Sequence, residues 1–137
     1  MKKLMFRLIQ FTWGLPQNLL GLILFLIYHR CRRETFRCAK ITYWKSDGGL
    51  SLGMFIFLPD DVEEGKRLDF FRYHEYGHSI QSLILGPLYL FIVGIPSFIW
   101  ANSRKLRRMR LDRNKGYYTF YTEKWANSIF KHYIKDR

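Results

Sequence analysis

The apolar block from Leu83 to Ala101 constrains this chain more than any other feature, because it has no charge and is long enough to cross a bilayer. Two breaks interrupt it, Gly86-Pro87 and Gly94-Ile95-Pro96. Glycine and proline interrupt the helix and leave backbone N–H and C=O groups without hydrogen bonds, which lipid cannot supply. The breaks therefore favour a re-entrant hairpin that is buried against protein. The sequence leaves both alternatives open for residues 86–101, a spanning segment or a re-entrant one.

Residues 1–30 form a second apolar section, with Lys2, Lys3 and Arg7 ahead of it. No small-residue cleavage site follows, so we interpret this section as a retained N-terminal helix rather than a removed signal peptide. Pro16 is typical of a first helical turn. Either a full span or a kinked, half-inserted helix fits the pattern.

The net charge of +12 predicts an anionic partner. Anionic lipid fits better than nucleic acid, because the basic run from Arg104 to Lys115 adjoins an apolar block and lacks interleaved aromatic residues. No flank of the apolar segments is depleted of Lys and Arg, so the polar parts are expected to face the cytoplasm of a bacterial inner membrane. The sequence indicates no oligomeric state.

Between the apolar sections, residues 35–58 predict a β-hairpin: Thr35–Lys45 and Leu50–Leu58 are rich in β-branched and aromatic residues, and Ser46-Asp47-Gly48-Gly49 separates them. Residues 66–85 predict a helix that Gly86-Pro87 ends. Residues 102–137 form a basic section with a final helix over about 117–134. The predicted fold class is α+β: a mostly helical, membrane-associated single domain with a β-hairpin before the helix at 66–85.

One pentapeptide carries chemistry, His74-Glu75-Tyr76-Gly77-His78. Residues four apart share a helix face, so both imidazoles can bind one zinc ion at about 2.0 Å. Glu75 follows the first histidine and can act as a general base on the water that zinc makes more acidic. Gly77 costs about 1 kcal/mol relative to Ala inside a helix, which predicts close approach of another backbone or of a substrate.

A catalytic zinc usually has three protein ligands, and the downstream candidates for the third are Asp112, Glu123 and His132. Asp112 lies among arginines, which favours an ion-pairing role. Glu123 is the preferred candidate, since Asn127 lies one helical turn after it and can orient a ligand histidine. His132 is a candidate for the third ligand or for the donor to an oxyanion.

With Glu123 as third ligand, the motif resembles the gluzincin branch of HExxH zinc metallopeptidases. The resemblance implies His74, His78 and Glu123 as zinc ligands and Glu75 as general base. It also implies that an edge strand beside the active-site helix holds extended substrate; Leu50–Leu58 is the candidate, and a plain core or membrane-facing strand is the alternative for this segment. That family commonly has an acidic residue where this chain has Asn127.

The glycine before the second histidine also resembles membrane-embedded metalloproteases, whose third ligand is the Asp of a Leu-Asp-Gly motif. Leu111-Asp112 is followed here by Arg113, so that match fails. The wider segment resembles short, uncharacterised bacterial membrane proteins.

The leading functional hypothesis is a membrane-associated zinc metallopeptidase that hydrolyses a peptide or protein substrate. Two alternatives remain: a non-catalytic membrane protein or scaffold with a structural metal site, and a basic lipid-binding module whose histidines are incidental.

Overall fold

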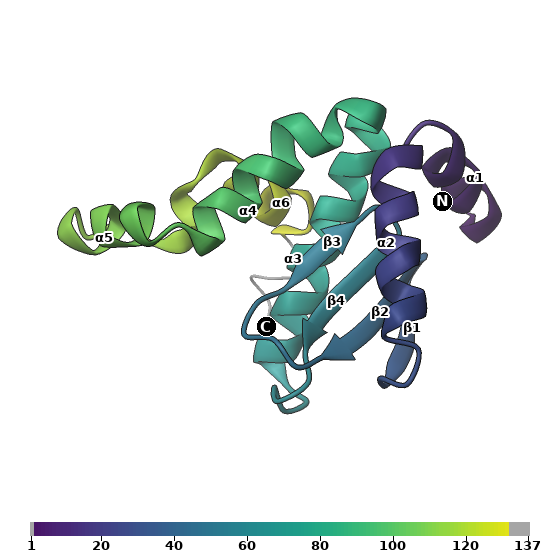
Figure 1. Ribbon diagram of the computed structural model, residues 1–137, viewed down its shortest axis with the longest axis horizontal. Helices are drawn as coiled ribbons and strands as arrows, with labels where there is room; N and C mark the ends of the chain where they lie inside the picture. Colours follow the sequence, from purple (N-terminus) through teal and green to yellow (C-terminus); the bar gives the residue numbers. More distant parts are fainter. Residues whose placement is uncertain (1, 132–137) are drawn as a thin grey trace.

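The computed structural model describes residues 2–131, which form one α+β unit built on a four-stranded sheet. Helix α2 (Leu15–Ile27) packs on one face of the sheet and α3 (Lys66–Leu85) on the other (Figure 1). The strands are β1 (Arg33–Phe36), β2 (Ala39–Trp44), β3 (Leu50–Leu52) and β4 (Phe55–Pro59). The core lies on both faces of the sheet, so β4 is buried along its whole length: Phe55 packs against Phe25 of α2, and other core residues pack against α3.

The predicted single hairpin at 35–58 is wrong. Each predicted strand is itself a tight hairpin, closed by two residues at Arg37-Cys38 and at Gly53-Met54. The order in the sheet is β1-β2-β4-β3, and the inner strands β2 and β4 pair in parallel. The segment at 46–49 therefore does not join paired strands: it carries the chain past β4 to the sheet edge, where β3 begins.

The N-terminal section is two helices rather than one. Helix α1 (Lys3–Thr12) and α2 meet at an angle of 106°, with Trp13 and Gly14 at the bend. The three amide side chains of the section turn inward at this corner and are completely buried. They are Gln10, Gln17 and Asn18, and their side chains bond to the backbone carbonyl of Ser79, to the hydroxyl of Ser82 and to the backbone N–H of Met54. The bend is thereby fastened to α3.

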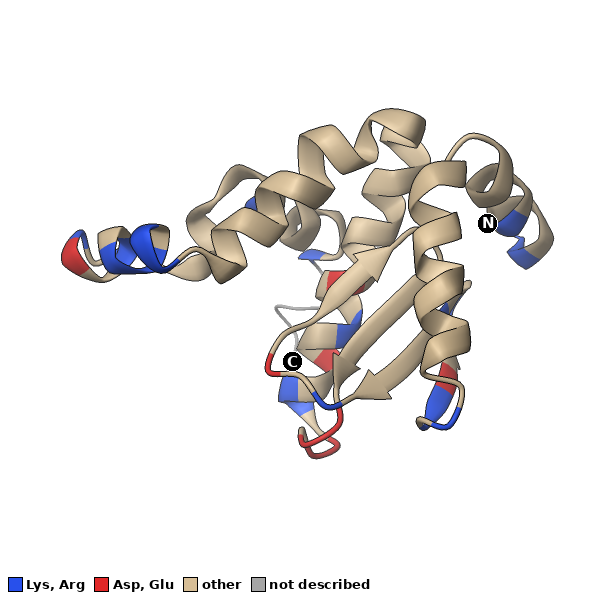
Figure 2. Cartoon of the chain, viewed as in Figure 1, with Lys and Arg blue, Asp and Glu red and all other residues tan. Residues whose placement is uncertain are grey.

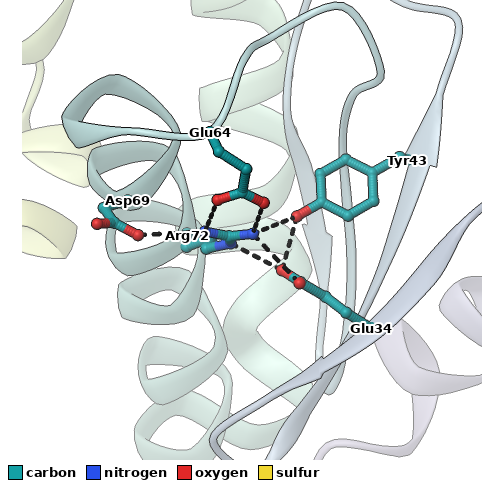
Figure 3. A network of polar contacts seen from close by, with 5 residues as sticks. All are labelled: Glu34, Tyr43, Glu64, Asp69 and Arg72. Carbon is teal, nitrogen blue, oxygen red and sulfur yellow. Dashed lines mark hydrogen bonds and ion pairs between the residues drawn. The ribbon is translucent and has the colours of Figure 1, made fainter.

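An ionic cluster fastens the other end of α3 (Figure 3). Arg72 is 8% exposed and reaches Glu34 of β1 at 2.7 Å, Glu64 at 2.8 Å and Asp69 at 3.1 Å. Its guanidinium also donates to the Tyr43 hydroxyl of β2. Because these partners come from two strands and a loop, Arg72 fixes the rotation of α3 two residues before His74.

After α3 the chain turns through η1 (Gly86–Leu88) and a π-helical turn, η2 (Leu90–Gly94), into α4 (Ile95–Asn102). The limbs of this bend lie at 120°. Within residues 2–131, no one helix combines the length and apolarity that crossing a bilayer requires; the two bent pairs meet those requirements only when their limbs are taken together.

The final section contains α5 (Arg104–Asp112), η3 (Tyr117–Thr119) and α6 (Tyr121–Ile129). The final helix therefore begins at Tyr121, four residues later than predicted. Arg and Lys concentrate on α5, which extends from the body, whereas α2 and α4 carry no charge (Figure 2). Arg110 differs from the other basic residues of α5 because its side chain is buried, with its guanidinium over the rings of Trp100 and Tyr117.

Candidate metal centre

Three of the predicted site residues lie together although they come from two helices. His74 and His78 occupy one face of α3, and Glu123 projects from the first turn of α6. The Glu123 Oε2 atom lies 2.9 Å from Nε2 of His74 and 2.9 Å from Nε2 of His78. All three residues are buried, Glu123 to 1% exposure. They are the one group of three or more metal-ligating side chains found among residues 2–131.

The close approach of α6 to α3 depends on Gly77. A Cβ atom at this position would lie 2.4 Å from the backbone oxygen of Ala126. The predicted reason for a glycine in this helix is thus confirmed, and the neighbour is another backbone. Since Ala126 follows Glu123 by three residues, this contact sets the depth at which the Glu123 carboxylate meets the imidazoles.

The Nδ1 atoms of both imidazoles, which point away from Glu123, contact side-chain amide oxygens. His74 Nδ1 lies 2.7 Å from Asn127 Oδ1, the contact predicted for Asn127, and His78 Nδ1 lies 2.6 Å from Gln81 Oε1. The Gln81 amide nitrogen donates to the Thr122 carbonyl at 3.0 Å, so its oxygen must face His78. An amide oxygen only accepts, so each Nδ1 carries the proton that it donates.

This arrangement needs positive charge at the centre, which either protons on the imidazoles or a metal ion can supply. With Nδ1 protonated, a neutral imidazole presents a lone pair at Nε2, and both lone pairs face the carboxylate oxygen of Glu123. Burial acts to raise the pKa of Glu123, but the hydrogen bonds and charges of the two histidines outweigh it, so the pKa of this carboxyl lies well below its usual range. Either extra protons or a metal ion must therefore lie between the three atoms. When both rings are neutral, two imidazoles and one carboxylate form a donor set that zinc can bind.

Glu75 lies beside this centre and faces the space next to it. Burial raises the pKa of Glu75 to about 7, with His74 lowering it and Glu123 raising it. Gly49, in the loop before β3, lies so close that a Cβ there would come within 2.4 Å of Glu75 Oε1. A carboxyl with a pKa near neutrality can both accept and release a proton at physiological pH.

Two functional candidates were missed from the sequence. One is Gln81, which bridges His78 to α6. The other is Tyr117, whose hydroxyl lies 3.3 Å from Glu123 Oε1. Burial raises the pKa of Tyr117, so its phenol stays protonated and remains a donor. Gln81 stands three residues after His78, a helical spacing that signals contact, whereas nothing in the sequence marks Tyr117.

The remaining predicted residues do not join the centre. Asp112 is exposed at the end of α5 and is not part of the metal-ligating group. His132 lies outside the described residues.

Comparisons with known proteins identify no relative: no protein-family model, no curated protein and no solved structure matches this chain. The chemistry of the site must therefore be argued from its own residues.

Proposed function

We propose that this protein is a zinc-dependent peptidase that works at a membrane surface. The observation that carries the proposal is the convergence of His74, His78 and Glu123 on one buried point, with a fourth carboxyl, Glu75, next to it. Zinc, when bound there, supplies a Lewis acid that polarises a carbonyl group and makes water more acidic.

The residues of the chain supply the rest of the reaction. Glu75 takes a proton from the attacking water as the water oxygen bonds to the carbonyl carbon. It then passes this proton to the amide nitrogen, whose bond to that carbon breaks. Burial, which raises the pKa of Glu75, helps it to hold the proton between the two transfers. Tyr117 lines the adjoining space, and its hydroxyl hydrogen, which Glu123 Oε1 accepts in this structure, would turn to the carbonyl oxygen as negative charge develops.

Of the segment Leu50–Leu58, only β3 lies at the edge of the sheet, because β4 is an inner strand. Strand β3 is therefore the candidate for holding substrate. Strand β3 packs beside α3, and the backbone leading into it contacts Glu75 at Gly49. A peptide that passes this edge therefore lies beside the general base, and pairing with the Ser51 carbonyl would displace the hydrogen bond from Tyr89.

Membrane association rests on the distribution of charge and exposed apolar side chains. Residues 8–28 and 76–103 contain no Lys, Arg, Asp or Glu. Large apolar side chains on these segments are nevertheless exposed, among them Ile23, Leu26 and Ile27 of α2 and Ile99 of α4. A lipid surface would cover them, and the basic side chains of α5 complement anionic headgroups.

Metal content and hydrolysis test the catalytic proposal in two steps. Detergent-purified protein should contain one zinc per chain, and His74→Ala and Glu123→Ala should lose it. His29→Ala is the matched control, since His29 is exposed and lies outside the site. Glu75→Gln should keep zinc and lose peptide hydrolysis. Zinc-free parent protein, or full activity in Glu75→Gln, would contradict the proposal.

Vesicle binding tests the membrane proposal. The chain should co-sediment with vesicles of phosphatidylcholine and phosphatidylglycerol more strongly than with phosphatidylcholine alone. Added salt should weaken the difference. Equal recovery with both vesicles would remove the role of anionic lipid.

A further inference from the structure

A cavity of about 290 Å³ opens directly beside the candidate metal centre. Glu75, His78 and Glu123 form one side of it. The other walls come from β3 and from the segment η2–α4, which contribute mainly apolar side chains: Leu50, Leu52, Leu90, Ile95, Phe98 and Ala101. The edge strand and the bent apolar segment thus enclose a space that ends at the reacting groups.

The polar side chains of these walls already have partners within the protein. The hydrogen bonds join Ser51 Oγ to Ser79 Oγ, Tyr89 Oη to the Ser51 carbonyl, Ser97 Oγ to Thr122 Oγ1 and Asn102 Nδ2 to the Phe98 carbonyl. A polar guest group would therefore compete with existing bonds, whereas an apolar group loses nothing on entry. The cavity is chemically an apolar pocket with its polar groups confined to the metal centre.

The cavity is large enough for one bulky side chain. Pockets that enclose whole drug-sized ligands measure roughly 300–1,000 Å³, and this cavity lies at the lower limit. A second cleft, of about 720 Å³, adjoins it and shares seven lining residues with it: Gly49, Leu50, Glu75, Phe98, Ala101, Asn102 and Tyr117. An extended chain can therefore run through the larger cleft past Glu75 and place one side chain in the apolar cavity.

We propose that this cavity is the specificity pocket of the protein, and that it selects peptides with a bulky apolar residue, such as Leu, Phe or Met, next to the bond that is cleaved. The inference rests on the proposed peptidase function and adds the class of substrate. Burial of such a side chain in an apolar pocket discriminates by about 10- to 200-fold for each methylene removed.

Two exposed positions allow the pocket to be reshaped without disturbing the core. Phe98 is 61% exposed, so Phe98→Ala should widen the pocket at little cost in stability. Ala101 is exposed as well, and Ala101→Phe should narrow it. The matched control is Phe91→Ala, because Phe91 is 71% exposed on the same segment and lines neither space.

The test uses octapeptides of Gly and Ser in which one central residue is Trp, Phe, Leu, Ala, Ser or Asp. Zinc-loaded protein should cleave the Phe and Leu peptides at least 10-fold faster in kcat/KM than the Ala peptide, with the cut beside the variable residue. Ala101→Phe should shift the preference from Phe towards Ala, Phe98→Ala should accept Trp, and Phe91→Ala should match the parent.

Peptide binding to Glu75→Gln, measured by fluorescence anisotropy with dye-labelled peptides, separates the two proposals. Cleavage without side-chain preference, or a preference that neither pocket variant moves, would overturn the specificity pocket alone. No cleavage together with preferential binding of Phe and Leu peptides would overturn the peptidase and leave an apolar peptide-binding pocket. No cleavage and no binding preference would overturn both.

Discussion

The substitution Gly77→Ala isolates the contact that brings the two halves of the metal centre together. The added Cβ would lie 2.4 Å from the backbone oxygen of Ala126, whereas ordinary van der Waals contact begins at 3.4 Å. The difference, 3.4 − 2.4 = 1.0 Å, must be absorbed by a movement of α6 away from α3, since neither backbone has a flexible end at this point. Ligand distances in a zinc site tolerate only about 0.2 Å.

Gly77→Ala should affect zinc affinity more strongly than it affects the free energy of unfolding. Overpacking costs about 1–3 kcal/mol, and replacing Gly by Ala inside a helix returns about 1 kcal/mol. The free energy of unfolding of the metal-free protein should therefore fall by only about 1 kcal/mol. Zinc affinity should fall at least about 10-fold, the lower end of the range found when the support of a ligand is lost.

Competition with a chromogenic chelator measures the zinc affinity, and urea denaturation with EDTA measures the stability. Gly48→Ala is the control, because a Cβ at Gly48 meets nothing within 4 Å. If Gly77→Ala instead raises the stability by the full helix-propensity gain and leaves zinc affinity unchanged, then the packing of α6 on Gly77 does not position Glu123.

Three further outcomes are expected. Gln81→Leu should weaken zinc binding by about 10- to 100-fold because the Nδ1 atom of His78 loses its acceptor, and Gln81→Glu, which keeps an acceptor oxygen, should recover part of the loss in the same chelator assay. In metal-free protein, the raised pKa of Glu75 means that the folded state binds more protons than the unfolded state between about pH 4.5 and 7. Its contribution to stability is therefore lost as pH rises through that window, and urea midpoints of Glu75→Gln should lack this loss; parallel profiles would contradict it. Arg72→Lys should lower the free energy of unfolding by about 1–3 kcal/mol, because a lysine cannot reproduce the forked contacts to Glu34, and an unchanged urea midpoint would show that the cluster does not stabilise α3.

Most of the residues at the candidate metal centre could be predicted from the sequence, because helical spacing alone places His74 and His78 on one face. Glu123 and Asn127 could be proposed since one turn separates them, and both lie at the centre. Tyr117 could not be proposed, because its place depends on how η3 packs against α6 rather than on any local pattern.

The strand topology could not be predicted from the sequence. Arg37 adopts a left-handed conformation (φ 52°). The sequence does not predict it, because such a position is usually occupied by glycine or asparagine. The stronger turn signal at Ser46–Gly49 therefore dominated the prediction, although it joins strands that are not neighbours. Similarly, Gln10 and Gln17 weaken the apolar pattern of residues 1–30, and only their partners on the distant helix α3 explain them.

The buried polar corner has a practical consequence for anyone who shortens the chain. Deleting residues 1–14, a natural choice for improving the behaviour of a protein with an apolar start, would remove Gln10 from between Ser79, Ser82 and Asn18. Ser79 follows His78 directly, so the truncation would leave an empty space and polar groups without hydrogen-bond partners one residue from a proposed metal ligand. If a shortened form failed to bind metal, the result would report damage to the support of His78, and would not show that the histidines are irrelevant.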